Sequence, residues 1–159
     1  TYPMIPKLWN QGNSAIEAMA NNQSIEFGNG CVVVSGNKGI LMPNGLYQRY
    51  PNLRQVDMDG KYQYVYDAKR GMNKIYGGKL VENICQGLAR CIIGEQMIKI
   101  SKKYKVVLTV HDAVACIAPE EEAQEAMAYV EECMKWVPDW ATGLPLSCEA
   151  GFGKSYGEC

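Results

Sequence analysis

Two apolar segments of the sequence, Val106–Val110 and Ala113–Ala118, are separated by only two residues. Both segments contain β-branched residues, which favour extended strands. A two-residue connection between strands is typical of a tight antiparallel hairpin. We therefore predict a β-hairpin with His111 and Asp112 at its tip. Because both strands are apolar, at least one face of the hairpin must be covered by other elements.

Two explanations of the His111-Asp112 turn are open at this point. Aspartate is common in turns because its side chain bonds to nearby backbone, and histidine tolerates positive φ, so the turn can be purely structural. Alternatively, the hairpin holds the Asp112 carboxylate out as an oxygen ligand for Mg²⁺. A single carboxylate binds Mg²⁺ weakly, and a two-metal site for phosphoryl transfer needs at least one more acidic ligand.

A long helix is predicted before the hairpin, from about residue 78 to residue 103. At about 100° per residue, four of its polar side chains fall within about 60° of one another. These side chains are Lys79, Asn83, Gln86 and Arg90, and the apolar residues Val81, Ile84, Leu88 and Ile92 lie opposite them. Two amides and two cations in a line suit the bases and phosphates of a nucleic acid. An ordinary amphipathic helix with a solvated polar side has the same spacing.

The remaining segments predict helices and strands that are segregated and mixed. Residues 3–21 indicate a helix that is interrupted at Gly12-Asn13-Ser14, with Ser14 as a second N-cap. Short strands between turn residues are predicted at 24–27, 31–34, 40–42, 46–47 and 61–66. Pro119 begins another helix that ends near residue 137, and residues 144–156 indicate one more strand and a Gly-rich loop. This arrangement predicts an α+β fold.

Charge is distributed unevenly along a chain whose net charge is −1. Residues 61–105 hold ten basic and three acidic side chains, a net charge of +7, whereas residues 111–159 hold two basic and ten acidic ones, a net charge of −8. The basic segment suits a polyanion such as nucleic acid, although a solvated surface with complementary faces has the same composition. No run of about 18 apolar residues is present, so no membrane contact is expected.

The cysteines indicate the compartment. The sequence has seven cysteines and one histidine, with no C-x-x-C spacing, which argues against a structural zinc site. Several cysteines lie in apolar runs, where a reduced cysteine behaves as a small hydrophobic residue. We therefore expect a reducing, cytoplasmic environment. The chain begins with Thr1 and shows no signal peptide, so we expect a trimmed or excised piece of a longer protein.

The order of these motifs resembles the C-terminal, palm-side part of phage DNA polymerases of family A, the DNA polymerase I-like family. Val110-His111-Asp112 between two apolar strands is similar to motif C of that family, usually written HDE. Residues 76–90 (YGGKLVENICQGLAR) resemble the phage version of the family's helix Q, and residues 40–45 (ILMPNG) resemble the stretch after the fingers. The tail at residues 153–156 (GKSY) is similar to the end of phage members, so the resemblance spans about residues 40–156.

The resemblance implies roles for individual residues in nucleotidyl transfer. Asp112 would be the motif C ligand of a two-ion Mg²⁺ site, and His111 would lie near the primer terminus. Lys79, Asn83 and Gln86 would contact the template or primer, whereas a DNA-binding role for Arg90 rests on the helical spacing alone. The implied partners are a primer-template DNA and a dNTP, in the cytoplasm of a host cell.

Two departures from the family pattern limit what this chain can do by itself. Ala113 stands where the family usually has glutamate, and no segment matches motif A or motif B. Asp57-Met58-Asp59-Gly60 is acidic, but its composition is that of a turn. We therefore expect the N-terminal polymerase portion on the same or a separate chain, and no activity from this chain alone.

The expected architecture is a single, partial domain over residues 1–159. It would be an α+β, palm-like fold in which an antiparallel hairpin packs against long helices. One alternative is a non-catalytic nucleic-acid-binding or assembly module derived from a polymerase palm. Another is an unrelated α+β protein whose His-Asp turn is accidental.

Overall fold

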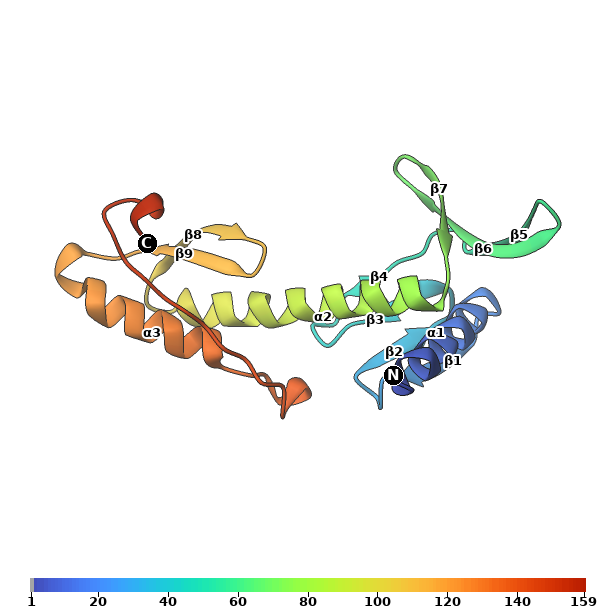
Figure 1. Cartoon of the computed structure of the whole chain (residues 1–159), viewed down its shortest axis with the longest axis horizontal. Helices are drawn as coiled ribbons and strands as arrows, with labels where there is room; N and C mark the ends of the chain where they lie inside the picture. The colour runs from blue at the N-terminus through green and yellow to red at the C-terminus, as the bar shows by residue number, and fades with distance from the viewer. Residues whose placement is uncertain (1) are drawn as a thin grey trace. The chain divides into compact units, whose positions relative to one another are not determined.

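The computed structural model describes residues 2–159. Contacts between residues divide the chain into two compact units, Thr1–Ala89 and Arg90–Cys159, which are described separately below (Figure 1). Helix α2 (Gly77–Ile100) contributes its first half to the first unit and its second half to the second. The single domain expected over residues 1–159 stays a prediction.

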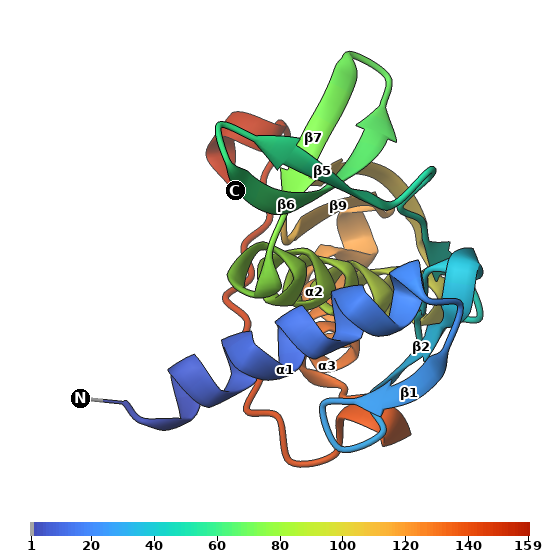
Figure 2. The same cartoon turned by 90° about the vertical axis from the view of Figure 1, so that its right-hand side faces the viewer.

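The first unit begins with helix α1 (Met4–Ala20), which packs on a four-stranded antiparallel sheet (Figure 2). The strands follow one another in the order β1 (Ser24–Phe27), β2 (Val32–Ser35), β3 (Ile40–Leu41) and β4 (Tyr47–Gln48), with a 3₁₀ turn, η1 (Gly36–Lys38), before β3. The buried side of α1 comprises Gly12, Ala15, Ile16, Ala18 and Met19. This spacing is that of an amphipathic helix, so the sheet is covered by the second half of α1.

The predicted interruption of the first helix is wrong, because α1 is continuous through Gly12-Asn13-Ser14. The Ser14 hydroxyl donates to the Asn10 carbonyl at 3.3 Å instead of capping a new helix. Gly12 lies where α2 begins, and a Cβ on it would be 2.6 Å from the carbonyl oxygen of Gly77. The backbone N–H of Gly77 donates to Asn13 Oδ1 at 2.6 Å. These residues, which are typical of turns, therefore serve the contact between two helices.

A three-stranded antiparallel sheet completes the first unit, with strands β5 (Arg54–Met58), β6 (Lys61–Ala68) and β7 (Gly71–Ile75). Of these, only β6 was predicted. Asp59 and Gly60 join β5 to β6 with φ of 56° and 76°, the positive values that a two-residue hairpin turn requires. Tyr66 of β6 packs edge-to-face on the buried Tyr50, with ring centroids 5.1 Å apart, and this contact anchors the sheet.

The second unit places the predicted hairpin on two helices. Strands β8 (Lys105–Val110) and β9 (Ala113–Ile117) are followed by a 3₁₀ turn, η2 (Glu120–Glu122), and helix α3 (Ala123–Lys135). The core is formed by Ile100, Tyr104, Ala126 and Cys133, and Val106, Val114 and Cys116 of the hairpin pack against it. The α+β class is therefore confirmed, with small antiparallel sheets and a hairpin covered by helices on one face.

One extra residue interrupts the pairing of the hairpin. Val106 pairs with Cys116 and Leu108 pairs with Ala115, so Val107 is left as a β-bulge. Directly opposed residues share a face of the sheet, so the bulge leaves both Val106 and Thr109 on the side of the core. The side chains of Val107, Leu108 and Val110 are 47%, 44% and 41% exposed.

The tail differs from the prediction, because residues 144–156 contain no strand in the part of the chain that the structure describes. Beyond α3 the backbone forms two short 3₁₀ turns, η3 (Asp139–Ala141) and η4 (Tyr156–Glu158), joined by irregular chain. The last turn is a capping box in which the Glu158 carboxylate accepts hydrogen bonds from the backbone N–H groups of Lys154 and Ser155. Local hydrogen bonds of this kind compete with strand pairing.

Candidate functional site

The two-residue turn at the tip of the hairpin presents His111 and Asp112 to solvent. Val110 pairs with Ala113, which is the last pair of the ladder, and His111 adopts a φ of 54°. Histidine tolerates this left-handed backbone better than β-branched residues do. Both side chains are exposed, and within residues 2–159 neither has a hydrogen-bond or ion-pair partner. Rigid strands therefore hold out a carboxylate that is free to bind.

A metal ion does not find a complete set of ligands near this turn. Residues 2–159 contain no group of three histidine, cysteine, aspartate or glutamate side chains that could hold a metal ion. Ala113 contributes no ligand, so Asp112 offers a single carboxylate. A two-ion Mg²⁺ site therefore does not fit the residues of this chain alone, since it needs acidic ligands from elsewhere.

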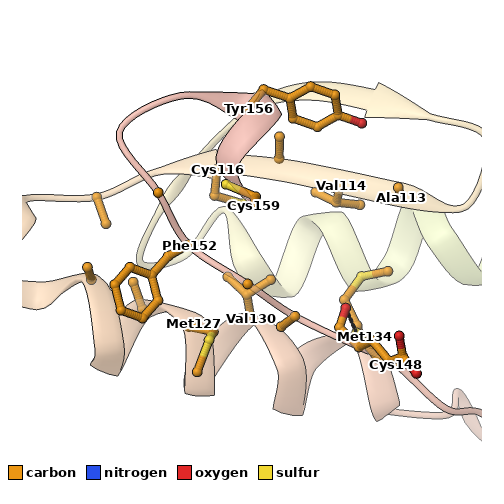
Figure 3. A pocket seen from close by; sticks show the side chains of 18 of the residues that line it. Ala113, Val114, Cys116, Met127, Val130, Met134, Cys148, Phe152, Tyr156 and Cys159 are labelled. Atoms are coloured by element: carbon orange, nitrogen blue, oxygen red, sulfur yellow. Dashed lines mark hydrogen bonds between the residues drawn. The ribbon is translucent and has the colours of Figure 1, made fainter.

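A surface pocket of about 520 Å³ extends from Asp112 along the inner side of the hairpin (Figure 3). Its walls come from β9, α3 and the tail, and its labelled apolar side chains include Val114, Met127 and Val130. Burial raises the pKa of the Cys116 and Cys148 thiols in this pocket. Mg²⁺ takes oxygen ligands, so these thiols do not supply the ligands that Asp112 lacks.

The polar side of α2, the second part of the predicted site, is largely occupied by contacts within the first unit. The Lys79 ammonium donates to both carboxylate oxygens of Glu82, at 2.9 and 3.0 Å, and Gln86 Nε2 donates to Glu82 Oε1 at 3.4 Å. The hydrogen bond to Glu82 is also the main cause that raises the pKa of Lys79. Two of the four predicted DNA-binding side chains thus share one carboxylate.

Asn83 serves the packing of the first unit. Its Nδ2 donates to the Tyr50 hydroxyl at 3.2 Å, and its backbone carbonyl accepts a hydrogen bond from Gln48 Nε2 at 3.0 Å. Burial raises the pKa of Tyr50 to about 12, despite the opposing effect of the hydrogen bond from Asn83. Asn83 therefore connects α2 to the tyrosines that anchor the β5–β7 sheet.

Arg90 differs from the other three residues of the stripe. It is exposed and lies where the second unit begins. In the described part of the chain its guanidinium has no hydrogen-bond or ion-pair partner. Of the four side chains that the helical spacing selects, Arg90 is thus the one whose charge is fully available to a phosphate.

Two residues that shape the site were not singled out from the sequence. Glu82 follows Lys79 by three residues and precedes Gln86 by four, and this helical spacing is the signal that could have identified it. Tyr50 lies 33 residues before Asn83, and no local pattern links the two.

No helix in residues 2–159 is both long enough and apolar enough to cross a membrane.

Comparison with known proteins gives one curated relative. The chain is similar to the DNA polymerase of Bacillus phage SP02, with 29% identity over an alignment of 176 residues that covers 97% of this chain. The chain spans 27% of the length of that relative. No family model matches the chain, and no solved structure matches it. The resemblance to a phage DNA polymerase that the motifs predicted is confirmed.

Proposed function

We propose that this chain forms part of a template-directed DNA polymerase of family A, in which it supplies a palm-like hairpin and contacts to the primer-template. The observation that carries the proposal is the similarity to a phage DNA polymerase over 97% of the chain. The free carboxylate of Asp112 at the tip of a supported hairpin agrees with this role. Such a polymerase would act in the cytoplasm of the host cell.

The reaction of the intact enzyme would join a dNTP to the primer. The primer 3′-hydroxyl attacks the α-phosphate of the dNTP, and pyrophosphate leaves. In this chain, Asp112 would supply one of the carboxylates of the catalytic centre, and His111 beside it would position the backbone of the primer terminus. When bound, Mg²⁺ supplies charge stabilisation at the phosphates. The remaining acidic ligands would come from the N-terminal polymerase portion, so this chain alone is expected to be inactive.

The contacts to DNA would come from the exposed part of the α2 stripe. Arg90 has an unpaired guanidinium and would bind a phosphate directly. Lys79 and Gln86 would have to exchange their contacts with Glu82 for contacts with the nucleic acid. Asn83 would contribute mainly by holding α2 against Tyr50. The expected order of importance among the four is therefore Arg90 first and Asn83 last for direct contact.

A hybrid polymerase tests the proposal. This chain would replace the aligned segment of the Bacillus phage SP02 polymerase, and primer extension would be measured with and without the substitution Asp112→Asn. Loss of one metal-binding carboxylate is expected to lower extension by more than about a hundredfold. Asp59→Asn is the matched control, because Asp59 also lies in a two-residue hairpin turn with positive φ.

The outcomes are distinguishable. Extension that is unchanged by Asp112→Asn would contradict the catalytic role of this turn. Extension by the isolated chain would contradict the inference that ligands are missing from it.

A second candidate function is a non-catalytic nucleic-acid-binding or assembly module. The alanine at position 113, beside Asp112, favours this candidate because it removes a carboxylate from the hairpin tip. Such a module would bind primer-template DNA in a salt-dependent way, without divalent cations, and Asp112→Asn would leave its affinity unchanged.

A further inference from the structure

A pocket of about 460 Å³ lies between the first half of α1 and the start of α2, within the first unit. Its volume is within the range of small-molecule sites, about 300–1,000 Å³. Its aromatic and polar side chains come from α1 (Trp9, Asn10 and Asn13), from Tyr76 before α2, and from Glu82 of α2. Gly78 also forms part of its lining. The hairpin site includes none of these residues, and the side chains of the α2 stripe contact only Glu82 among them.

Two exposed aromatic rings flank Gly78. Trp9 is 49% exposed and Tyr76 is 62% exposed. A Cβ on Gly78 would lie 3.4 Å from Tyr76 Cε2 and 3.6 Å from Trp9 Cε2 and Nε1. In the part of the chain that the structure describes, the rings of Trp9 and Tyr76 make no ring contact with each other. The missing side chain of Gly78 therefore leaves space beside two rings at the distance of aromatic stacking.

The polar groups of the pocket match the edge of a nucleobase. Asn13 Oδ1 accepts the hydrogen bond from the Gly77 N–H, whereas its amide nitrogen and the whole side-chain amide of Asn10 have no partner among the described residues. An amide offers both donors and acceptors to a base. The negative charge of Glu82 is offset by the Lys79 ammonium at 2.9 Å, which places a cation next to the pocket.

We propose that this pocket binds one unpaired nucleobase of a DNA strand, stacked against Trp9 and Tyr76 with its edge toward Asn10 and Asn13. The proposal rests on the proposed function, since it adds a site for single-stranded DNA to a DNA polymerase. Aromatic rings take any base because every base has a π-face. An apolar polypeptide segment is a poorer match, because amides and a carboxylate would be left without partners when it covered them.

The test measures how the full chain binds a fluorescent single-stranded oligonucleotide of about 12 nucleotides, a length within the usual site size. Gly78→Ala adds a methyl group between the rings at ordinary contact distances, so the fold is preserved while the space is filled. Trp9→Leu keeps an apolar side chain but removes the stacking face, and Trp9→Phe restores a ring. Affinity is expected to fall about tenfold for Gly78→Ala and Trp9→Leu. Trp9→Phe is expected to stay within about threefold of the unaltered chain.

A second readout reports stacking directly. A fluorescent adenine analogue in the oligonucleotide should be quenched on binding to the unaltered chain and to Trp9→Phe, and should stay bright with Gly78→Ala. Tyr62→Ala is the control, because Tyr62 is 73% exposed and does not line the pocket; it should change neither measurement.

Each outcome is decisive for the pocket. Wild-type affinity of Gly78→Ala and Trp9→Leu would overturn the nucleobase site, and so would failure of the unaltered chain to bind single strands. The polymerase proposal is judged separately by primer extension with Asp112→Asn, so the two can fail independently.

Discussion

Adjacent glycines at the start of α2 are expected to respond in opposite ways to the same substitution. In Gly77→Ala, the new Cβ would lie 1.9 Å from the carbonyl oxygen of Trp9 and 2.9 Å from the backbone nitrogen of Asn13. Both are backbone atoms of α1, which cannot move without shifting the helix. In Gly78→Ala, the Cβ meets ring atoms at 3.4 and 3.6 Å, which is ordinary van der Waals contact.

The magnitude follows from three contributions. Overpacking of a well-packed contact costs about 1–3 kcal/mol. Separation of the helices also weakens the 2.6 Å hydrogen bond from Gly77 to Asn13, a further loss of about 1 kcal/mol. Alanine in place of glycine in a helix returns at most about 1 kcal/mol. Gly77→Ala should therefore lower the free energy of unfolding by about 1–3 kcal/mol, whereas Gly78→Ala should leave it unchanged or raise it by up to about 1 kcal/mol.

Urea unfolding measures the difference between the two variants. With a slope of about 1–3 kcal/mol per molar urea, a loss of about 2 kcal/mol in Gly77→Ala should lower the midpoint by about 0.7–2 M. Circular dichroism would follow the helices, and the indole NMR signal of Trp9 would report the first unit by itself. A midpoint for Gly77→Ala equal to or above that of Gly78→Ala would refute the close approach of α1 and α2.

Three further predictions concern the second unit, a surface carboxylate and DNA binding. Gln96, which is 1% exposed, donates to two backbone carbonyls at the end of α3. Gln96→Leu leaves both carbonyls without a donor and should lower the free energy of unfolding by about 2–4 kcal/mol, as measured by thermal denaturation. Hydrogen bonds from Asn52 and, second, from Arg54 lower the pKa of Asp67. These bonds therefore stabilise the fold above the ordinary carboxyl pKa, and this stabilisation is lost as the pH falls through the lowered pKa of Asp67. Asn52→Ala should raise the pKa of Asp67, measured by NMR, toward its ordinary value, and an unchanged titration would count against these contacts. Arg90→Ala should weaken binding to duplex DNA and reduce the slope of log affinity against log salt by about one, whereas Lys79→Ala should have the smaller effect in the same anisotropy assay, because Lys79 is already paired with Glu82.

The hairpin and α2 could be predicted because their signals are local. Two apolar segments and a two-residue turn define β8 and β9, and each predicted strand differs from the observed one by a single residue at one end. The helical repeat places α2 within three residues of its observed ends. In both elements, the hydrophobic pattern agrees with the backbone geometry, so tertiary contacts did not change the outcome.

The errors have causes outside the local sequence. Gly12 is of a residue type that disfavours helices, but glycine is needed at this position because the backbone of Gly77, which is distant in the sequence, lies close to it. Strands β5 and β7 are largely exposed, so they lack the alternation of apolar residues on which strand prediction depends. The stripe on α2 was selected by spacing, which cannot distinguish the free Arg90 from Asn83, whose amide is bound to Tyr50.

The bulge at Val107 has a consequence for how the length of this hairpin can vary. Val106 and Thr109 both face the core although they are three residues apart, and a regular strand would place them on opposite faces. A deletion of Val107 would leave each neighbouring pair, Val106 with Cys116 and Leu108 with Ala115, in its present register. A deletion of Thr109 would instead bring Leu108 opposite Val114 and turn its side chain toward the core. Insertions and deletions between homologous hairpins should therefore concentrate at this one position, while the length from Leu108 to the Asp112 turn stays constant.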